Sequence, residues 1–257
     1  MEQAMRLNPR FPPIYSFQLG WAYGLMGRYP ETITALKEFL SRNPNYFAAY
    51  RILAASYVQQ WTSQQSADAQ TLTQALAAAQ RAVALNDSFS FGHALVGYVY
   101  LWQKRYDQAV AELERAVVLA PNEAYNYAIL AAVLNQAGRL EDALRAAEQA
   151  QRLQSSGPLD HHLAFIGSVY SLAGRPEEAI APLKQYLSRY PNFLGAHLTL
   201  AAVYSDLGKE AEARAEAAEV LRINPKFSLE VHRQRVPIKD PAMLERHIAA
   251  LRKAGLK

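Results

Sequence analysis

The sequence repeats itself with a period of 34 residues, and this repeat limits the folds that the chain can adopt. Three stretches align without gaps: LGWAYGLMGRYPETITALKEFLSRNP from Leu19, VGYVYLWQKRYDQAVAELERAVVLAP from Val96 and LAAVYSDLGKEAEARAEAAEVLRINP from Leu200. In each stretch an apolar residue precedes a small one, an aromatic residue follows three positions later, and proline ends the stretch. A unit this short cannot bury a core alone, so we expect successive units to stack into one elongated array.

Each unit has the pattern of two antiparallel helices, here called helix A and helix B. Residues with high helix propensity dominate the composition, and no segment alternates as a strand does. Small residues fall where helix A should press on helix B, at Gly20, Ala54, Gly97, Ala131, Gly167 and Ala201. Aromatic residues that should fill the gap between neighbouring helices follow at Tyr23, Tyr57, Tyr100, Tyr170 and Tyr204. Glycine supplies the turn between the helices at Gly27, Gly138, Gly174 and Gly208, where positive φ is needed.

Six complete units follow from this alignment. Their predicted boundaries are 13–46, 47–89, 90–123, 124–157, 160–193 and 194–227. The opening EQAMRLNP resembles EQAQRLQS at the end of the fourth unit, so we expect residues 1–12 to be the end of a truncated preceding unit. That interpretation predicts a piece of a longer protein, and the alternative is a native start with an incomplete repeat. Residues 228–257 do not form a seventh unit and are predicted to be a C-terminal cap.

The pattern closely resembles the tetratricopeptide repeat, abbreviated TPR. The resemblance implies an all-α fold, a right-handed superhelical solenoid of six helix pairs closed by a capping helical segment. It also implies that the A helices line the concave face, where members of this family hold protein segments. The expected partner is therefore a protein or peptide segment, which could belong to the same protein, and a homo-oligomer is an alternative.

A catalytic or metal site is not expected in this chain. There are no cysteines, which excludes thiol chemistry and cysteine-based zinc sites. His93 and His197 occupy equivalent positions three units apart, and packing against their own helix B explains both. His161 and His162 are adjacent, so their side chains diverge by about 100° on a helix and cannot chelate together. No nucleotide-binding or nucleophile motif occurs, and no cofactor is predicted.

A peptide-binding groove is predicted from the positions that should face inward on the A helices. Its candidate residues are Phe17, Trp21, Arg51, Phe91, Tyr98, Trp102 and Tyr125. Aromatic and arginine side chains are the usual anchors of protein interfaces. The inward positions of the fifth and sixth units are smaller and more polar. The alternative is that many of these aromatic residues simply pack against the next helix A.

One binding mode of the family can be tested on the sequence. Chaperone-binding TPR proteins hold a C-terminal carboxylate with a set of lysine, asparagine and arginine side chains at fixed positions of helix A. The best-aligned positions here are Phe17, Trp21, Ile52, Phe91 and Leu95. Because no register of the six units supplies the required set of cations, that carboxylate clamp is excluded.

The second unit is nine residues longer than the others, with the excess in QQWTSQQSADAQT from Gln59. It could lengthen both helices into a protruding lip. Alternatively it is a loop in which Ser66 caps helix B and Asp68 lies in the first turn of that helix. Trp61 would be exposed in the second case unless it folds back.

The C-terminal segment is basic and contains two predicted helices. From Arg222 onward there are nine Lys/Arg and three Asp/Glu, whereas the chain as a whole has a net charge of only +4. Ser228 should cap a short helix that ends near Pro237, and Asp240 followed by Pro241 should begin a second. A polar terminal cap explains the charge better than a nucleic-acid or anionic-lipid contact. No stretch is long and apolar enough to span a membrane, and there is no signal sequence.

The stretches NPKFSLEVHRQRVPIKDPAMLERHIAALRKAGL, GYVYLWQKRYDQAVAELERAV and MRLNPRFPPIYSFQLGWAYGLMGRY resemble the C-terminal TPR region of bacterial class III adenylate and guanylate cyclases. The resemblance implies a regulatory or interaction module of a bacterial signalling protein. A cyclase domain is implied only for a parent protein, because this chain contains none. The repeats would lie in the cytoplasm, unless a membrane segment upstream in the parent places them in the periplasm. The alternative function is a scaffold whose groove is filled by its own cap or by a second copy.

Overall fold

The computed structural model describes residues 12–153 and 161–257, and these residues form only helices and their connections. The helices are α2 (Ile14–Leu25), α3 (Tyr29–Arg42), α4 (Phe47–Thr62), α5 (Thr71–Leu85), α6 (Ser90–Trp102), α7 (Tyr106–Leu119), α8 (Ala124–Gln136), α9 (Leu140–Arg152), α10 (His161–Leu172), α11 (Pro176–Arg189), α12 (Leu194–Asp206), α13 (Glu210–Ile223), α14 (Leu229–Arg235) and α15 (Pro241–Lys253). The all-α prediction is thereby confirmed. None of these helices is both long and apolar enough to cross a bilayer.

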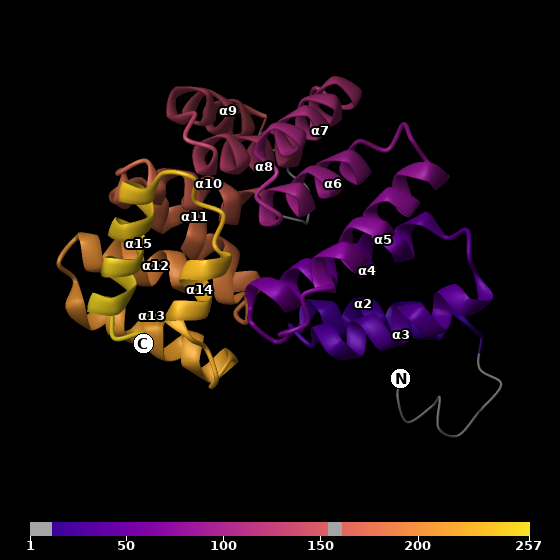
Figure 1. Cartoon of the computed structure of the whole chain (residues 1–257), viewed down its shortest axis with the longest axis horizontal. Helices are drawn as coiled ribbons and strands as arrows, with labels where there is room; N and C mark the ends of the chain where they lie inside the picture. The colour runs from indigo at the N-terminus through magenta and orange to yellow at the C-terminus, as the bar shows by residue number, and fades with distance from the viewer. Residues whose placement is uncertain (1–11, 154–160) are drawn as a thin grey trace.

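The first twelve of these helices, α2 to α13, form six antiparallel pairs that stack in chain order. Each predicted unit contains one pair, while residues 1–11 and the boundary at 154–160 lie outside the described residues. The stack curves strongly: α2 to α5 lie on one side of the molecule, α6 to α9 run across the top, and α10 to α15 complete the other side (Figure 1). The A helices α4, α6, α8, α10 and α12 contact one another and line the inside of the curve.

The predicted close approach of helices A and B is confirmed at the small residues. A Cβ atom added to Gly167 would lie 2.4 Å from Leu183 Cγ, and one added to Gly97 would lie 2.9 Å from the Ala109 carbonyl oxygen. Ala54, which takes the same place in the second unit, has no exposed surface. The side chain that follows three positions later is buried in each of the five units that carry tyrosine there, at Tyr23, Tyr57, Tyr100, Tyr170 and Tyr204.

The insertion of the second unit is a loop, over residues 63–70, that follows a helix lengthened to 16 residues. Asp68 precedes the first turn of α5, which begins at Thr71, so its predicted place within that turn is wrong. Instead the Asp68 carboxylate accepts a hydrogen bond from the Gln70 backbone N–H, and Ser66 Oγ lies 2.9 Å from Thr71 Oγ1. Trp61 lies within α4 and is partly buried, because the loop folds against the C-terminal cap rather than protruding.

The cap contains the two predicted helices with their predicted N-caps. Ser228 Oγ accepts a hydrogen bond from the Val231 N–H, and Asp240 Oδ1 accepts one from the Met243 N–H at 2.8 Å. The longer helix, α15, packs on α12 and buries Ile248 and Leu251 completely or nearly so. Its apolar stripe therefore covers the open side of the last repeat, while its charged residues remain at the surface.

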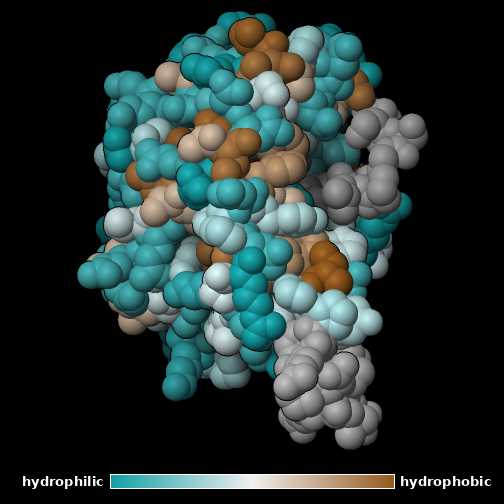
Figure 2. Space-filling model, turned by 90° about the vertical axis from the view of Figure 1, so that its right-hand side faces the viewer, coloured by the Kyte–Doolittle hydropathy of each residue, from teal (hydrophilic) through white to brown (hydrophobic). Residues whose placement is uncertain are grey.

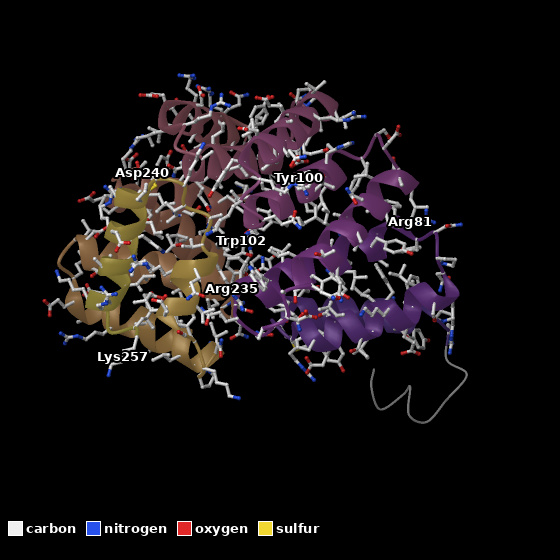
Figure 3. All side chains as sticks on the ribbon, viewed as in Figure 1. Arg81, Tyr100, Trp102, Arg235, Asp240 and Lys257 are labelled. Carbon is white, nitrogen blue, oxygen red and sulfur yellow. The ribbon has the colours of Figure 1, made fainter. Side chains whose placement is uncertain are left out.

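The cap also reaches the second repeat, so the two ends of the curve meet. The Gln64 side chain exchanges two hydrogen bonds with the Ser228 backbone, at 2.8 and 2.9 Å. Arg235 donates to the Trp61 carbonyl oxygen at 2.7 Å, and its guanidinium lies 3.8 Å from the centre of the Trp61 ring. Figure 3 shows Arg235 beside Trp102 near the middle of the molecule, and both border one open cleft with Trp61. The superhelix is thus a nearly closed ring.

The outer surface is mostly hydrophilic, with separate hydrophobic areas on the side seen in Figure 2. Helix α2 contributes several exposed apolar side chains, because no helix stacks in front of it among the described residues. They are Ile14, Tyr15, Trp21, Leu25 and Met26, each between 38% and 51% exposed.

Candidate functional site

The inner face of the ring carries a continuous group of aromatic side chains from successive A helices. Phe91 of α6 stacks on Tyr125 of α8, with ring centres 4.6 Å apart and planes 12° apart. Tyr125 meets the edge of Phe165 of α10, and Phe165 meets the edge of Tyr98 of α6. The series continues to Trp102, whose ring centre lies 6.3 Å from that of Tyr98. Because each of these rings lies on the inward side of its helix A, helices that are distant in sequence meet here through one ring after another.

Arg51 of α4 lies at the start of this series. Its guanidinium carbon is 4.9 Å from the centre of the Phe91 ring, a cation–π contact. Burial lowers the pKa of Arg51, while Tyr125 nearby acts in the opposite direction. Arg51 makes no hydrogen bond or ion pair with any described residue, although its side chain is mostly buried.

The tyrosines of the inner face are also deeply placed. Burial raises the pKa of Tyr98 to about 12, so its hydroxyl is protonated near neutral pH. Burial likewise raises the pKa of Tyr29, Tyr125 and Tyr186, and each of these is raised further by another tyrosine of the group. On the inner face, Tyr98 and Tyr125 therefore carry neutral hydroxyl groups, and Tyr125 lies close enough to Arg51 to act on its charge.

A cavity of about 130 Å³ lies next to this series. Tyr98, Trp102, Phe165 and Phe193 form its aromatic wall, and the small polar residues predicted for the fifth and sixth units border it at Ser168, Ser171 and Thr199. The cap closes the opposite side through His232, Val236, Ile238 and His247. The carboxamide oxygen of Gln136, which also lines the cavity, is buried without a hydrogen-bond partner among the described residues. The cavity is therefore largely apolar with one unsatisfied acceptor.

His232 and His247 form a pair inside the cap. Their Nε2 atoms are 3.1 Å apart, so one ring donates to the other and at least one of these nitrogens carries no proton. Burial lowers the pKa of His232 to about 3 and that of His247 to about 4, and for His232 the second imidazole lowers it further. Both rings are consequently neutral near pH 7, which suits the apolar wall they contribute to.

The seven predicted groove residues lie in three different places. Five of them, Arg51, Phe91, Tyr98, Trp102 and Tyr125, belong to the inner series just described. Phe17 instead packs in a separate cluster with Phe39 and Tyr46, at ring-centre distances of 5.3 and 5.1 Å. Trp21 is exposed on α2 and forms no ring contact with the series among the described residues. Phe91 and Tyr125 pack against each other across neighbouring A helices, as the packing alternative expects, and Phe17 packs on helix B of its own unit. Contact of any of the seven residues with a ligand stays a prediction.

Several residues of the site were not predicted from the sequence. Phe165 was assigned to the polar half, although it joins Tyr98 to Tyr125. Phe193 is the N-cap residue of α12, as Tyr46 is of α4, and the aromatic residue at this repeated place was the available signal. The cap residues Val236 and Ile238 could be found only from the three-dimensional path of the chain.

The histidines outside the cap have structural partners. His93 Nδ1 lies 2.7 Å from Glu112 Oε2, and His197 Nδ1 lies 2.6 Å from Glu216 Oε2, so both face helix B of their own repeat as predicted. Burial alone would lower the pKa of His197, but its hydrogen bonds to Glu216 and to the Pro191 carbonyl raise it overall. Among the described residues, no three His, Asp or Glu side chains are arranged to hold a metal ion.

Two family models, both described as tetratricopeptide repeat, match the chain at residues 171–233 and 16–46. The chain also superposes over 99% of its length on a chain of the APC/C hetero-tetramer Cut9–Hcn1, with a TM-score of 0.60 and 17% identity. The fold is a TPR solenoid. This chain spans 44% of the Cut9–Hcn1 chain that it matches, and identity at this level shows the TPR fold alone.

Other solved structures are similar to a lesser degree. One is YrrB, described as a TPR protein with an unusual peptide-binding site, at 18% identity and a TM-score of 0.42 over 75% of this chain and 94% of that one. Another is pilF of Pseudomonas aeruginosa, at 16% identity and a TM-score of 0.48 over 86% of this chain and 95% of that one. A search of curated proteins found no significant match to the sequence.

Proposed function

We propose that this chain is a non-catalytic TPR module that binds a protein segment along the inner face of its ring. One observation carries the proposal: the cavity of about 130 Å³ whose wall is formed by Tyr98, Trp102 and Phe165. Apolar cavities of this size hold small apolar groups, and a leucine or phenylalanine side chain of a partner offers such a group. The neighbouring arginine and aromatic rings are of the residue types that supply most binding energy at interfaces.

The test is a peptide array probed with the intact chain and with two tryptophan variants. We expect Trp102→Ala to weaken binding of the selected peptides by at least about tenfold, because it removes part of the cavity wall. Trp21→Ala should change binding by less than about threefold, since Trp21 forms no ring contact with the inner series among the described residues and does not border the cavity. Circular dichroism of each variant checks that the helices are retained. Unchanged binding by the Trp21→Ala/Trp102→Ala double variant would exclude the inner face as the binding surface.

We further propose that the repeats regulate or assemble a bacterial signalling protein such as an adenylate or guanylate cyclase. The support is the resemblance of three stretches, among them NPKFSLEVHRQRVPIKDPAMLERHIAALRKAGL, to the C-terminal region of such enzymes. The genomic sequence upstream of the codon for Met1 tests this directly. An in-frame cyclase domain with its metal-binding aspartates is expected, and an in-frame stop codon there would contradict it.

A second candidate function is an oligomerising scaffold whose groove is filled by its own cap or by a second copy. The observation that favours it is the closure of the cavity by Val236 and Ile238, which already cover part of the inner face. Lys239 reinforces this closure by donating its backbone N–H to the Gln136 backbone carbonyl oxygen at 2.9 Å. Sedimentation velocity distinguishes the two functions. A concentration-dependent dimer without peptide binding supports the scaffold, whereas a monomer that binds peptide supports the interaction module.

A further inference from the structure

Arg51 is a mostly buried cation without an anionic partner. Several exposed arginines of this chain have a carboxylate partner, as Arg28 does in Glu31 at 2.8 Å and Arg139 in Asp142 at 2.6 Å. Arg51, in contrast, makes neither an ion pair nor a hydrogen bond with any described residue, and its contact is with the face of Phe91. Removing a charge from water is costly unless a partner of opposite charge and good geometry replaces the water. Such an arrangement favours a ligand that supplies the missing charge.

The surroundings of Arg51 can contribute hydrogen-bond donors to the same ligand. Tyr125 stacks on the ring that Arg51 covers, and Tyr98 is joined to Tyr125 through Phe165. The hydroxyls of both tyrosines are neutral and can donate. Glu123 acts on Tyr125, but its exposed carboxylate accepts a hydrogen bond from the Tyr125 backbone N–H at 3.4 Å and forms no ion pair with Arg51. The cation is therefore not neutralised from within the described residues.

We infer that Arg51, together with the Tyr98 and Tyr125 hydroxyls, forms a receptor for a carboxylate of the bound protein segment. A guanidinium presents two parallel N–H groups that match the two oxygens of a carboxylate. Because Tyr98 lies in both the series and the cavity wall, the carboxylate and an apolar side chain of one segment can be held side by side. The partner is thus an acidic segment with an adjacent apolar residue. This inference rests on the proposed function and names the chemistry of its ligand.

The arrangement differs from the carboxylate clamp that the sequence excludes. The clamp uses several cations and asparagines from successive repeats, whereas here one arginine is surrounded by rings and phenolic hydroxyls. A single cation in such a site favours an acidic segment over a neutral one, and it can bind more than one kind of carboxylate. Two sources fit this chemistry: the side chain of an internal Asp or Glu, and the carboxylate at the end of a chain.

Fluorescence anisotropy with labelled peptides tests the inference. Each peptide selected on the array is compared with a version in which Asp and Glu are replaced by Asn and Gln, and with a version that has an amidated C-terminus. We expect the Asn/Gln version to bind about tenfold more weakly, as is typical of losing a hydrogen bond to a charged group. The same loss with the amidated version would assign the chain terminus as the source instead.

Variants of the receptor provide a second readout. Arg51→Gln should weaken the acidic peptide about tenfold and leave the Asn/Gln version unchanged, while Arg51→Lys should restore part of the affinity. Arg81→Gln is the matched control, since Arg81 is exposed on the next helix and bonds to Asn45 at 3.0 Å. Figure 3 shows Arg81 on the right-hand side of the molecule, away from Trp102. Tyr125→Phe should weaken the acidic peptide alone, by less than Arg51→Gln does.

The unfolding temperature of the protein without ligand provides an independent test of the receptor. If Arg51 is unpaired until an anion binds, the Arg51→Met variant without ligand should unfold at a higher temperature than the unaltered protein, because an unpaired buried charge has been removed. A lower unfolding temperature would show that the cation–π contact stabilises the fold, and would contradict the receptor. Equal binding of acidic and Asn/Gln peptides would also refute the receptor while leaving the peptide-binding function intact. Failure of every peptide to bind would refute both.

Discussion

Acidification should release the cap, because the His232–His247 pair is neutral in the folded protein. The pKa of His232 is lowered to about 3 and that of His247 to about 4, whereas an imidazole in the unfolded chain titrates near 6.5. A group whose pKa is lower in the folded state has no effect on stability above the unfolded pKa. Below it, the unfolded chain binds a proton that the folded chain does not, so stability falls with pH.

The size of the effect follows from the two pKa differences. Each pH unit below 6.5 costs about 1.4 kcal/mol for each histidine that stays neutral in the folded state, so His232 costs about 2 kcal/mol at pH 5. His247 is partly exposed, which reduces its share, and we expect a total loss of about 3 kcal/mol for the pair. That loss is a large part of the stability of an ordinary domain, which is about 5–15 kcal/mol.

Urea unfolding followed by tryptophan fluorescence, at pH 7.5 and at pH 5, measures this loss. The reference is the His232→Gln/His247→Gln variant, which cannot gain these protons and should show a much smaller difference between the two pH values. Other groups titrate in both proteins alike: the raised pKa of His197 and the raised pKa of Asp206 both favour the folded state at low pH. If the two proteins lose stability in parallel between pH 7.5 and pH 5, the reasoning is refuted.

Three further predictions use the same urea assay. Gly97→Ala should destabilise by about 2–3 kcal/mol, because its Cβ would lie 2.9 Å from the Ala109 carbonyl oxygen; Gly24→Ala, whose nearest neighbour would be 3.6 Å away, should instead stabilise by up to about 1 kcal/mol. Lys104 has φ of +59°, so Lys104→Gly should stabilise by about 0.5 kcal/mol, and any loss above about 1 kcal/mol would contradict a strained backbone there. Asp240→Ala should cost about 1 kcal/mol through loss of the N-cap, and no change would show that the cap is held by packing alone.

The repeat could be predicted from the sequence because its determinants are local. The steric requirement at Gly97 and Gly167, and the N-caps at Ser228 and Asp240, depend on residues within one helix pair or one turn. At Lys104 the backbone adopts the left-handed conformation although the residue is not glycine, and the glycine pattern predicted no such turn there. Local rules therefore specify the elements well, and they fail where the fold tolerates an unfavourable residue.

The candidate site could be predicted only in part. The inward positions of helix A identified Arg51 and Tyr125 correctly as neighbours of one surface, because helical periodicity fixes the face on which they lie. Whether such a residue meets a ligand, another ring or the cap depends on the curvature of the stack. Curvature accumulates from small rotations between repeats, and no single residue encodes it. For this reason the contact of Arg235 with Trp61 could not be predicted from the sequence.

The hydrogen bonds between Gln64 and Ser228 join residues 164 positions apart and change how this solenoid should unfold. An open repeat array can lose its terminal units one at a time, because each unit depends only on its neighbours. Here the second repeat and the cap depend on each other. Closing a loop of this length costs conformational entropy, and other contacts of the fold must compensate that cost before these hydrogen bonds form. We therefore expect folding to end, not begin, with the joining of the two ends, and the free energy of unfolding to be shared by all the repeats at once. A deletion of the cap should accordingly weaken protection from hydrogen exchange in α4, far away along the chain.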